Sequence, residues 1–381
     1  MTTPLLPVST SDPAALTAAL AAALSGGPAV LPVAPGLEDV AAQAVAAHPE
    51  VPAGTALVIR TSGSTGVPKL VALPATALRA SAEATAERFG GDGQWLVTLP
   101  LHLISGAQML VRSILGGTEP VFLAQPAQDD DFLAAAAEMT GERRYVSLVP
   151  VQFSRLLDRA TADPAAAETL RRFDAILVGG QALPRALRQR AHELDLRLVR
   201  SYGMSESAGG CVYDGVEIGD TLVRIRGGEV QLAGPSLASG YLGDAEQTAE
   251  RFFVDGDTRW YRTGDAGELL GGMLTVLGRL DNVIVSGGVN VSLDEVERVA
   301  KELPGWGEAV AVGVPDDTWG ERVALVRPAA PGEPEPESPA AAIRAELGVA
   351  AVPARLDTVQ EIPRLAGGKP DRISLRARLL G

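Results

Sequence analysis

Two loops that contain glycine carry lysines that could bind an anion. Lys and Arg together number 33, but three of these are lysines, and two of the three, Lys69 and Lys369, lie in such loops. A compact ammonium on a flexible stem can approach an anion where a wide guanidinium fork does not fit. The segment 61–69, which is rich in Ser, Thr and Gly, follows the apolar run 56–59. We therefore predict a phosphate-binding loop that directly follows a strand.

This first loop offers backbone N–H groups and hydroxyls to phosphate oxygens without forming a Walker A motif. Leu70 follows the lysine where that motif needs Ser or Thr, and a proline precedes it in place of glycine. A flexible surface turn of the same composition is the alternative interpretation. The candidate binding residues are Thr61, Ser62, Gly63, Ser64, Thr65, Gly66 and Lys69.

Further segments carry groups that suit a nucleotide. Glycines that end the apolar run 176–178 would let a flat ring lie against the backbone. The segment 201–206 contains both an aromatic ring, which can stack on a base, and a carboxylate, which can bind Mg²⁺. The acidic residue of the Thr-Gly-Asp segment suits a pair of vicinal hydroxyls. The residues are Gly179, Gly180, Gln181, Ser201, Tyr202, Gly203, Met204, Ser205, Glu206, Asp265, Arg279 and Asp281, followed by Gly287 and Gly288.

Each of these residues also has an ordinary structural interpretation. Asp265 could cap a turn, Arg279 could form a surface ion pair, and Glu206 and Lys369 could be solvated loop residues. The Gly203 segment falls short of a nucleophile elbow, because serine replaces its second glycine, so a serine hydrolase is disfavoured. The occurrence of all the segments in this order favours a shared function.

In this order the segments resemble the core motifs of the acyl-adenylate-forming (AMP-binding) ligases, from residue 55 to residue 372. The resemblance implies an ATP-dependent acid–CoA ligase that forms an acyl-adenylate and then an acyl-CoA thioester. It also implies ATP, Mg²⁺ and coenzyme A as the cofactors and co-substrate. A small domain would turn about a hinge at Asp281.

The same resemblance implies a role for each candidate residue. The loop residues from Ser62 to Gly66 and Lys69 would surround pyrophosphate, and residues 179–181 and 201–205 would bind AMP, with Tyr202 stacked on adenine. Thr65 and Glu206 would bind Mg²⁺ and act in catalysis with Lys369. Asp265 and Arg279 would take the ribose, and Gly287 and Gly288 would approach the CoA thiol.

The trimmed N-terminal part narrows the resemblance. About sixty residues precede the loop, and with segments 99–102 and 286–291 this resembles the short actinobacterial o-succinylbenzoate–CoA ligases of menaquinone biosynthesis. His102, Ser105 and Gly106 would lie at the acid or CoA site, although His102 could also be a buried core imidazole. Leu103 stands where the family commonly has histidine.

Three other functions remain open at this stage. One is a ligase for another aromatic or short carboxylic acid, and the second is a stand-alone adenylation protein that loads a carrier-protein thiol. The third is a nucleotide-binding regulator without catalysis, which is disfavoured because the charged motif residues are all present.

Alternating apolar and Ala-rich segments predict a layered α/β domain at residues 1–280, with a β-rich, mostly antiparallel part at 210–277. A small, mobile α+β lid domain is expected at 281–381. The expected strands are 56–59, 95–99, 120–123, 145–149, 176–178, 196–199, 309–314, 322–326 and 356–359. The expected helices are 75–88, 106–115, 130–139, 151–159, 184–193, 292–303 and 340–347, with a Pro/Glu-rich linker at 328–339.

Composition excludes several classes of protein. A net charge of −14 argues against broad binding of nucleic acid. No apolar run is long enough to span a membrane, and the N-terminus lacks the pattern of a secretory signal. A single cysteine fits a reducing compartment, so we expect a cytoplasmic enzyme. The histidines and this cysteine lack zinc spacing, and a homodimer is left open.

Overall fold

The computed structural model describes residues 1–61, 68–123, 127–329, 336–365 and 369–380. The chain forms two compact units. Unit 1 comprises Met1–Leu183, Gln189–Arg224 and Gln231–Arg262, and unit 2 comprises Pro184–Arg188, Ile225–Val230 and Thr263–Gly381. The predicted domain boundary at residues 280 and 281 falls inside unit 2. In the described part of the chain, no helix is both long and apolar enough to cross a bilayer.

The first sheet of unit 1 is mixed and has the order β15-β5-β4-β2-β1-β3. Strands β1, β2 and β4 are parallel, and β5 returns antiparallel to β4. Strand β4 is buried over Thr55–Ile59, as its continuous apolar run predicts. The strand bounds are Thr2–Ser9 (β1), Ala29–Val33 (β2), Glu50–Pro52 (β3), Thr55–Thr61 (β4), Lys69–Pro74 (β5) and Gly240–Tyr241 (β15).

The second sheet of unit 1 has the order β12-β11-β10-β9-β8-β6-β7. Strands β7, β6, β8, β9 and β10 are parallel, so their carboxyl ends share one edge. The strand bounds are Gln94–Val97 (β6), Val121–Phe122 (β7), Arg144–Leu148 (β8), Ala175–Gly179 (β9), Leu198–Met204 (β10), Gly209–Tyr213 (β11) and Val216–Glu217 (β12).

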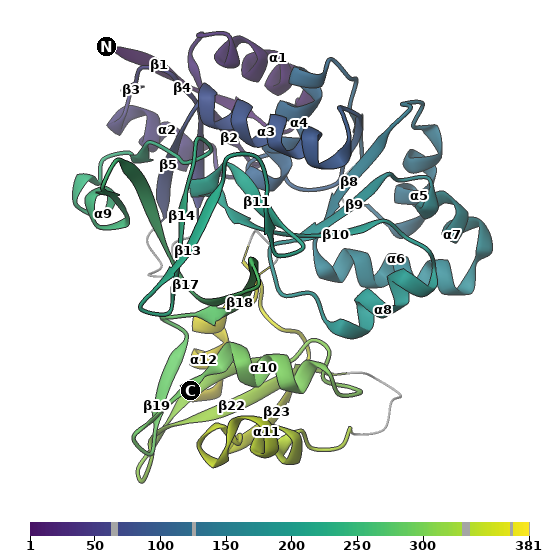
Figure 1. The fold of residues 1–381 in the computed structure, drawn as a ribbon, viewed down its shortest axis with the longest axis vertical. Helices are drawn as coiled ribbons and strands as arrows, with labels where there is room; N and C mark the ends of the chain where they lie inside the picture. Colours follow the sequence, from purple (N-terminus) through teal and green to yellow (C-terminus); the bar gives the residue numbers. More distant parts are fainter. Residues whose placement is uncertain (62–67, 124–126, 330–335, 366–368, 381) are drawn as a thin grey trace. The chain divides into compact units, whose positions relative to one another are not determined.

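Two helices lie between these sheets (Figure 1). Helix α3 contacts β4 and β5 of the first sheet and β11 of the second, and α4 contacts α3, β6 and β11. Both helices end at a glycine in the left-handed conformation, Gly90 or Gly117. The helices of this part of the chain are Pro13–Leu24 (α1), Glu38–Ala47 (α2), Ala75–Phe89 (α3), Ile104–Gly116 (α4), Asp129–Glu138 (α5), Pro150–Ala162 (α6), Pro164–Arg171 (α7), Arg185–Glu193 (α8) and the 3₁₀ turn Ser205–Ser207 (η1).

The third sheet confirms the predicted antiparallel β-rich region. Its order is β13-β14-β17-β16, and β18 pairs with β17. Strands β16 and β18 both run antiparallel to the long strand β17. The bounds are Leu222–Arg226 (β13), Glu229–Ala233 (β14), Ala245–Arg251 (α9), Phe252–Asp255 (β16), Thr258–Leu270 (β17) and Met273–Arg279 (β18).

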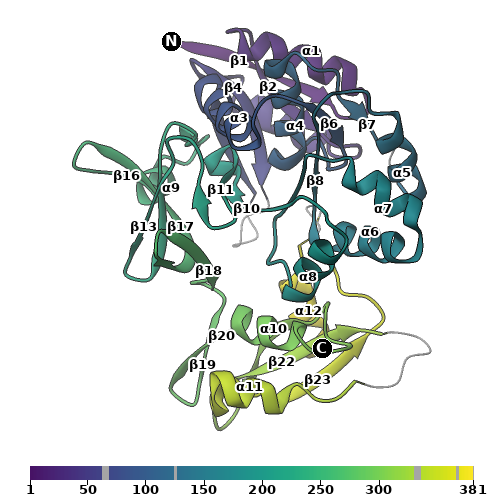
Figure 2. The ribbon, with the colours of Figure 1, turned by 45° about the vertical axis from the view of Figure 1, so that its right-hand side comes forward.

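In unit 2, helices cover both faces of the fourth sheet, β20-β19-β22-β21 with β23 paired to β22 (Figure 2). Ala309 and Ala311 pack with α10 and α11, whereas Val310 and Val312 pack with α12, because successive side chains of a strand face opposite sides. The bounds are Val283–Ser286 (β19), Val289–Ser292 (β20), Leu293–Lys301 (α10), Val310–Asp316 (β21), Gly320–Pro328 (β22), Ala340–Leu347 (α11), Val349–Ala351 (η2), Arg355–Val359 (β23) and Arg372–Leu380 (α12).

The predicted α/β class is confirmed, and every predicted strand and helix overlaps an observed one. The elements that the sequence did not predict include α7, α9, α12, the strands β5, β15, β19 and β20, and the five elements before residue 55. The helix expected at 292–303 is observed as α10, and the hydroxyl of Ser292 before it accepts a hydrogen bond from the Glu295 N–H at 3.3 Å. Within the predicted linker, residues 330–335 lie outside the described part of the chain.

Candidate active site

The two ends of the predicted phosphate loop are fixed side by side. Thr61 ends β4 and pairs directly with Lys69, the first residue of β5. The predicted loop residues Ser62, Gly63, Ser64, Thr65 and Gly66 lie outside the described residues. The Lys69 ammonium lies over the ring of Tyr241, 5.1 Å from its centroid. Tyr241 belongs to β15, which pairs with β5.

Tyr241 connects this lysine to the predicted Mg²⁺ ligand. Its hydroxyl donates a 2.9 Å hydrogen bond to Oε1 of Glu206, which lies in η1 directly after β10. The backbone carbonyl of Glu206 accepts from the Ala238 N–H at 2.8 Å. Burial, followed by the charge of Glu206, raises the pKa of Tyr241, so the hydroxyl keeps its proton at neutral pH. Lys69, Tyr241 and Glu206 therefore form one polar cluster within unit 1.

The predicted adenine segments meet at the carboxyl ends of β9 and β10. Gly179 pairs with Ser201, and a Cβ on Gly179 would lie 2.9 Å from the Ser201 carbonyl oxygen. At Gly203 a Cβ would lie 2.0 Å from the Gly209 carbonyl oxygen. Gly180 has a φ of +82°. Gly179 and Gly203 are needed for close backbone approach, whereas Gly180 is favoured by its positive φ. Gln181, Tyr202, Met204 and Ser205 lie in the same two segments.

The predicted acid segment forms a tight turn before α4. A Cβ on Gly106, in the first turn of α4, would lie 2.2 Å from the Pro100 carbonyl oxygen, so packing of the helix against the preceding turn by itself requires this glycine. Ser105 is exposed, and Leu103 is half-buried. The Nε2 atom of His102 is buried and has no hydrogen-bond partner in the described part of the chain, and burial lowers the pKa of this imidazole. His102 is therefore neutral at pH 7 and offers a polar atom to a ligand.

In unit 2, Asp265 and Arg279 face each other across β17 and β18. Their Oδ1 and Nη1 atoms are 3.1 Å apart. Arg279 also donates to both carboxylate oxygens of Asp281, at 3.0 Å each, and to the carbonyl oxygen of Thr263 at 2.9 Å. The hydrogen bond to Asp281 is the largest of the effects that raise the pKa of Arg279. The predicted ribose pair and the predicted hinge residue thus form one cluster.

The backbone of the second lysine loop is held while the Lys369 side chain is exposed. The Leu365 N–H donates to the Lys369 carbonyl oxygen, and the Asp371 N–H donates to that of Pro363, at 2.8 Å each. Gly367 and Gly368 lie outside the described residues. Gly287 and Gly288 form the β19–β20 turn, with φ of +57° and +81°. A Cβ on Gly287 would lie 2.5 Å from the Trp319 ring, so its glycine has a packing reason.

Two segments of the chain match models of known protein families. Residues 23–226 match the AMP-binding enzyme family, and residues 295–369 match the AMP-binding enzyme C-terminal domain. The chain belongs to the AMP-binding enzyme family.

Several relatives of this AMP-binding enzyme have been named or solved. A protein from Mycobacterium tuberculosis (strain ATCC 25618 / H37Rv), named probable 2-succinylbenzoate–CoA ligase, is 37% identical over 97% of each chain. A variant of Escherichia coli MenE with bound OSB-AMS is 27% identical with a TM-score of 0.73, over 93% of this chain and 82% of that one. The O-succinylbenzoate coenzyme A synthetase of Bacillus subtilis in complex with AMP is 27% identical with a TM-score of 0.72, over 86% and 70%.

One buried cation of this AMP-binding enzyme, Arg112, was not predicted from the sequence. Arg112 lies on α4, is 6% exposed, and lies over the Trp95 ring at 4.8 Å. Its Nη2 donates to the Tyr213 hydroxyl at 3.3 Å, and its Nε has no hydrogen-bond partner within the ranges that the structure describes. Among the described residues, no carboxylate pairs with it. A buried charge is normally paired, so Arg112 is a candidate to receive the anionic group of a ligand.

The residues that could hold Mg²⁺ are few. Within the described ranges, no group of three or more His, Cys, Asp or Glu side chains could hold a metal ion. The Glu206 carboxylate is the kind of hard oxygen ligand that Mg²⁺ takes alongside substrate phosphates. Glu206 lies in the same cluster as Lys69, which ends the phosphate loop. This position fits an Mg²⁺ ion that also binds the phosphates.

Proposed function

We propose that this enzyme is an ATP-dependent 2-succinylbenzoate–CoA ligase of menaquinone biosynthesis. The similarity to the mycobacterial relative carries the proposal, because it extends over nearly the full length of both chains. The solved relatives named for bound OSB-AMS or AMP support the same acid and the same nucleotide. ATP and coenzyme A are then substrates, and the enzyme works in the cytoplasm.

In the first half-reaction, a carboxylate oxygen of the acid bonds to the α-phosphorus of ATP. The bond from this phosphorus to pyrophosphate breaks, and the electron pair leaves with pyrophosphate. The enzyme must align the two anions and neutralise the charge on the phosphoryl oxygens. Lys69, at the end of the phosphate loop, and Lys369, with its exposed side chain on an anchored loop, are suited to this role.

Mg²⁺ would supply positive charge at the phosphate oxygens, with Glu206 and Thr65 as its protein ligands. Tyr241 orients the Glu206 carboxylate by hydrogen bonding to Oε1. Asp265 and Arg279 would receive the ribose hydroxyls. The glycines of β9 and β10 would let adenine approach the backbone, with Tyr202 stacked on it.

In the second half-reaction, the sulfur of CoA bonds to the acyl carbon and the carbon–oxygen bond to AMP breaks. AMP leaves with the electron pair, and the thiol proton passes to water. Lys369 must withdraw to make room, which is the reason for proposing a lid domain at 281–381 with its hinge at Asp281. Gly287 and Gly288 would then approach the thiol.

Arg112 is the cation that we propose for the second carboxylate of the acid. 2-Succinylbenzoate has two carboxylates, and the one that does not react needs a cation. Arg112 is a buried guanidinium without a carboxylate partner among the described residues. His102 lies on the turn that precedes the same helix, ten positions before Arg112, and its Nε2 atom has no hydrogen-bond partner among the described residues.

The test is a screen of carboxylic acids for acid-dependent ATP–pyrophosphate exchange, followed by an assay of AMP release with CoA. We expect exchange with 2-succinylbenzoate and formation of its CoA thioester. Exchange with benzoates or short fatty acids but not with 2-succinylbenzoate would contradict the assigned acid. AMP release with a phosphopantetheinyl carrier protein but not with CoA would indicate a carrier-loading protein.

A further inference from the structure

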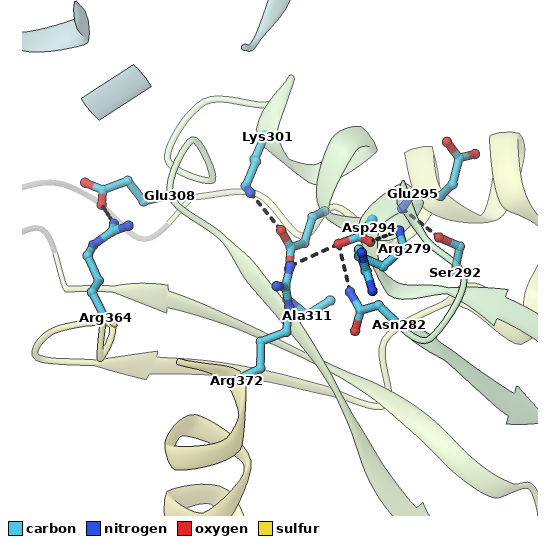
Figure 3. A network of polar contacts seen from close by, with 11 residues as sticks. Arg279, Asn282, Ser292, Asp294, Glu295, Lys301, Glu308, Ala311, Arg364 and Arg372 are labelled. Atoms are coloured by element: carbon cyan, nitrogen blue, oxygen red, sulfur yellow. Dashed lines mark hydrogen bonds and ion pairs between the residues drawn. The ribbon is translucent and has the colours of Figure 1, made fainter. Parts of the chain in front are cut away.

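A partly buried ionic cluster in unit 2 plays no part in the function as proposed so far. It consists of Asp294 and Glu297 on α10 and Arg372 at the start of α12 (Figure 3). Nη2 of Arg372 is 3.0 Å from Oδ1 of Asp294 and 2.7 Å from Oε1 of Glu297. The side chain of Glu297 is 6% exposed and that of Asp294 is 20% exposed. Each carboxylate therefore depends on protein donors for most of its stabilisation.

Asp294 receives hydrogen bonds from both sides of the predicted hinge residue Asp281. Its Oδ2 accepts from the backbone N–H of Arg279 at 2.7 Å, and its Oδ1 accepts from Nδ2 of Asn282 at 2.7 Å. A Cβ on Gly278 would lie 2.6 Å from the Cβ of Asp294, so a glycine is needed for this approach. A rotation of the backbone about the hinge at Asp281 would change the direction of the Arg279 N–H relative to α10. The bond to Asp294 is therefore specific to one conformation of the hinge.

Arg372 connects the cluster to the loop that carries Lys369. Arg372 follows Lys369 by two intervening residues and begins α12. Arg364, on the opposite arm of the Lys369 loop, pairs with Glu308 at 2.6 Å. Glu297 is held independently, since its Oε1 also accepts from the Ala311 N–H at 2.9 Å and its Oε2 lies 2.8 Å from Nζ of Lys301. Arg372 thus anchors one arm of the Lys369 loop to a fixed site on α10.

We propose that Asp294 and Arg372 are positioning residues that form a clasp between the hinge segment 279–282 and the loop that carries Lys369. This proposal rests on the proposed function, because it assigns the clasp to the lysine-dependent half-reaction. The clasp holds the loop at a set position relative to the hinge, so Lys369 reaches the carboxylate and the α-phosphate together. Thioester formation does not use Lys369 and does not need the clasp.

The kinetic test separates the two half-reactions in Asp294→Ala and Arg372→Ala. We expect each variant to lose roughly tenfold to hundredfold in pyrophosphate exchange, as for misplacement of a catalytic group by about 1 Å. Thioester formation from synthetic 2-succinylbenzoyl-adenylate and CoA should stay within about threefold of wild type. Arg372→Lys and Asp294→Asn should recover part of the exchange, because each keeps some of the hydrogen bonds.

Arg376→Gln is the matched control, since Arg376 lies on the same helix and pairs with Glu321 at 3.1 Å. It should leave both half-reactions unchanged. The double variant of Asp294 and Arg372 should lose no more exchange than the worse single variant, because the two residues act as one unit. Equal loss of both half-reactions, or full activity in the single variants, would overturn the clasp.

Amide hydrogen exchange gives a readout that does not depend on catalysis. In the unliganded enzyme, amide hydrogen exchange in peptides that contain the Arg279 N–H should accelerate at least about tenfold in Asp294→Ala. It should stay unchanged in Arg376→Gln. Unchanged protection in Asp294→Ala would overturn the proposal. If none of the carboxylic acids supports ATP–pyrophosphate exchange by the wild type, the proposed function fails. The amide hydrogen exchange of Asp294→Ala alone then decides whether the clasp exists.

Discussion

The hydroxyl of Tyr241 donates a 2.9 Å hydrogen bond to Oε1 of Glu206, and the ring of the same tyrosine lies under the ammonium of Lys69. One side chain therefore contacts both the end of the phosphate loop and the predicted Mg²⁺ ligand. Since burial keeps the hydroxyl protonated, it is a permanent donor that fixes one carboxylate oxygen of Glu206.

Tyr241→Phe should keep the ring beside Lys69 and remove the hydrogen bond to Glu206. Hydrogen bonds to charged groups contribute about 1.5–3 kcal/mol, so pyrophosphate exchange should fall roughly tenfold to hundredfold. The loss should be smaller at high Mg²⁺, which a titration of the exchange rate with Mg²⁺ measures. Tyr145→Phe is the control, because that hydroxyl donates to the Gly91 carbonyl oxygen at 2.9 Å. An unchanged Mg²⁺ dependence in Tyr241→Phe would contradict the orienting role.

Arg112→Met should raise the KM for 2-succinylbenzoate and leave the KM for ATP unchanged. The substitution removes a buried guanidinium and keeps an apolar chain beside Trp95. Loss of a charge-assisted hydrogen bond predicts an increase of at least about tenfold. Steady-state kinetics with each substrate varied in turn measures both constants. An equal increase of both KM values would indicate a general structural role for Arg112.

The predicted elements came from local patterns, and their success has local causes. Helix α11 was predicted with its observed bounds, since Pro339 precedes it and Gly348 follows it. Strand β4 was recognisable from its apolar run beside the Ser/Thr/Gly loop. The N-terminal elements were missed because Ala- and Pro-rich segments such as Ala29–Val33 carry little periodicity, although burial in the first sheet makes this segment a strand.

The unpredicted parts of the site depend on contacts between distant residues. Tyr241 reaches Lys69 because the two-residue strand β15 pairs with β5, and no local pattern marks so short a strand. Arg112 is buried on α4 together with the polar residues Gln108 and Ser113, and no local pattern sets it apart from them. Asp294 looks like an ordinary acidic residue of a first helical turn, whereas its partner Arg372 lies 78 positions later in the chain.

Gly287→Ala should destabilise the enzyme more than Gly288→Ala. Both glycines have positive φ, which costs about 1–2 kcal/mol for alanine. Only at Gly287 would the new methyl group also meet the Trp319 ring, since the space around Gly288 is open. Thermal unfolding of the two variants measures the difference. Equal destabilisation would mean that the Trp319 contact is absent in solution.

Asp371→Ala should remove a cap from α12. The Asp371 carboxylate accepts from the Ser374 hydroxyl at 2.7 Å and from the Ser374 N–H at 3.0 Å. The hydrogen bond from the Ser374 hydroxyl, followed by the one from the Ser374 N–H, lowers the pKa of Asp371 below its ordinary value of 3.8. The folded state favours the ionised form, so this stabilisation is present above the unfolded pKa and is lost as pH falls through the folded pKa.

The free energy of unfolding should fall by about 1 kcal/mol in Asp371→Ala at pH 7, and this difference from wild type should shrink as the pH falls below about 4. Urea unfolding across this range measures the free energy of unfolding for both proteins. Ser374→Ala, which keeps the backbone donor, should lose less. A difference between wild type and Asp371→Ala that is independent of pH would exclude the ionised cap.

Lys369→Ala should abolish adenylate formation and spare the second half-reaction. The side chain is exposed, so the substitution should leave the fold intact, and the loop backbone keeps its hydrogen bonds through Leu365 and Asp371. The loss of a cation that contacts both reacting anions should reduce pyrophosphate exchange by roughly a hundredfold or more. Thioester formation from supplied acyl-adenylate should remain close to wild type.

Lys301→Ala is the matched control for Lys369→Ala. Lys301 pairs with Glu297 at 2.8 Å, and Glu297 keeps Arg372 and the Ala311 N–H as donors after the substitution. Exchange should therefore stay near the wild-type rate in this variant. Rapid-quench measurement of each half-reaction in the three proteins separates the steps. If Lys369→Ala slowed both steps equally, the lysine would not be specific to adenylation, and the reason for a lid that withdraws it would be lost.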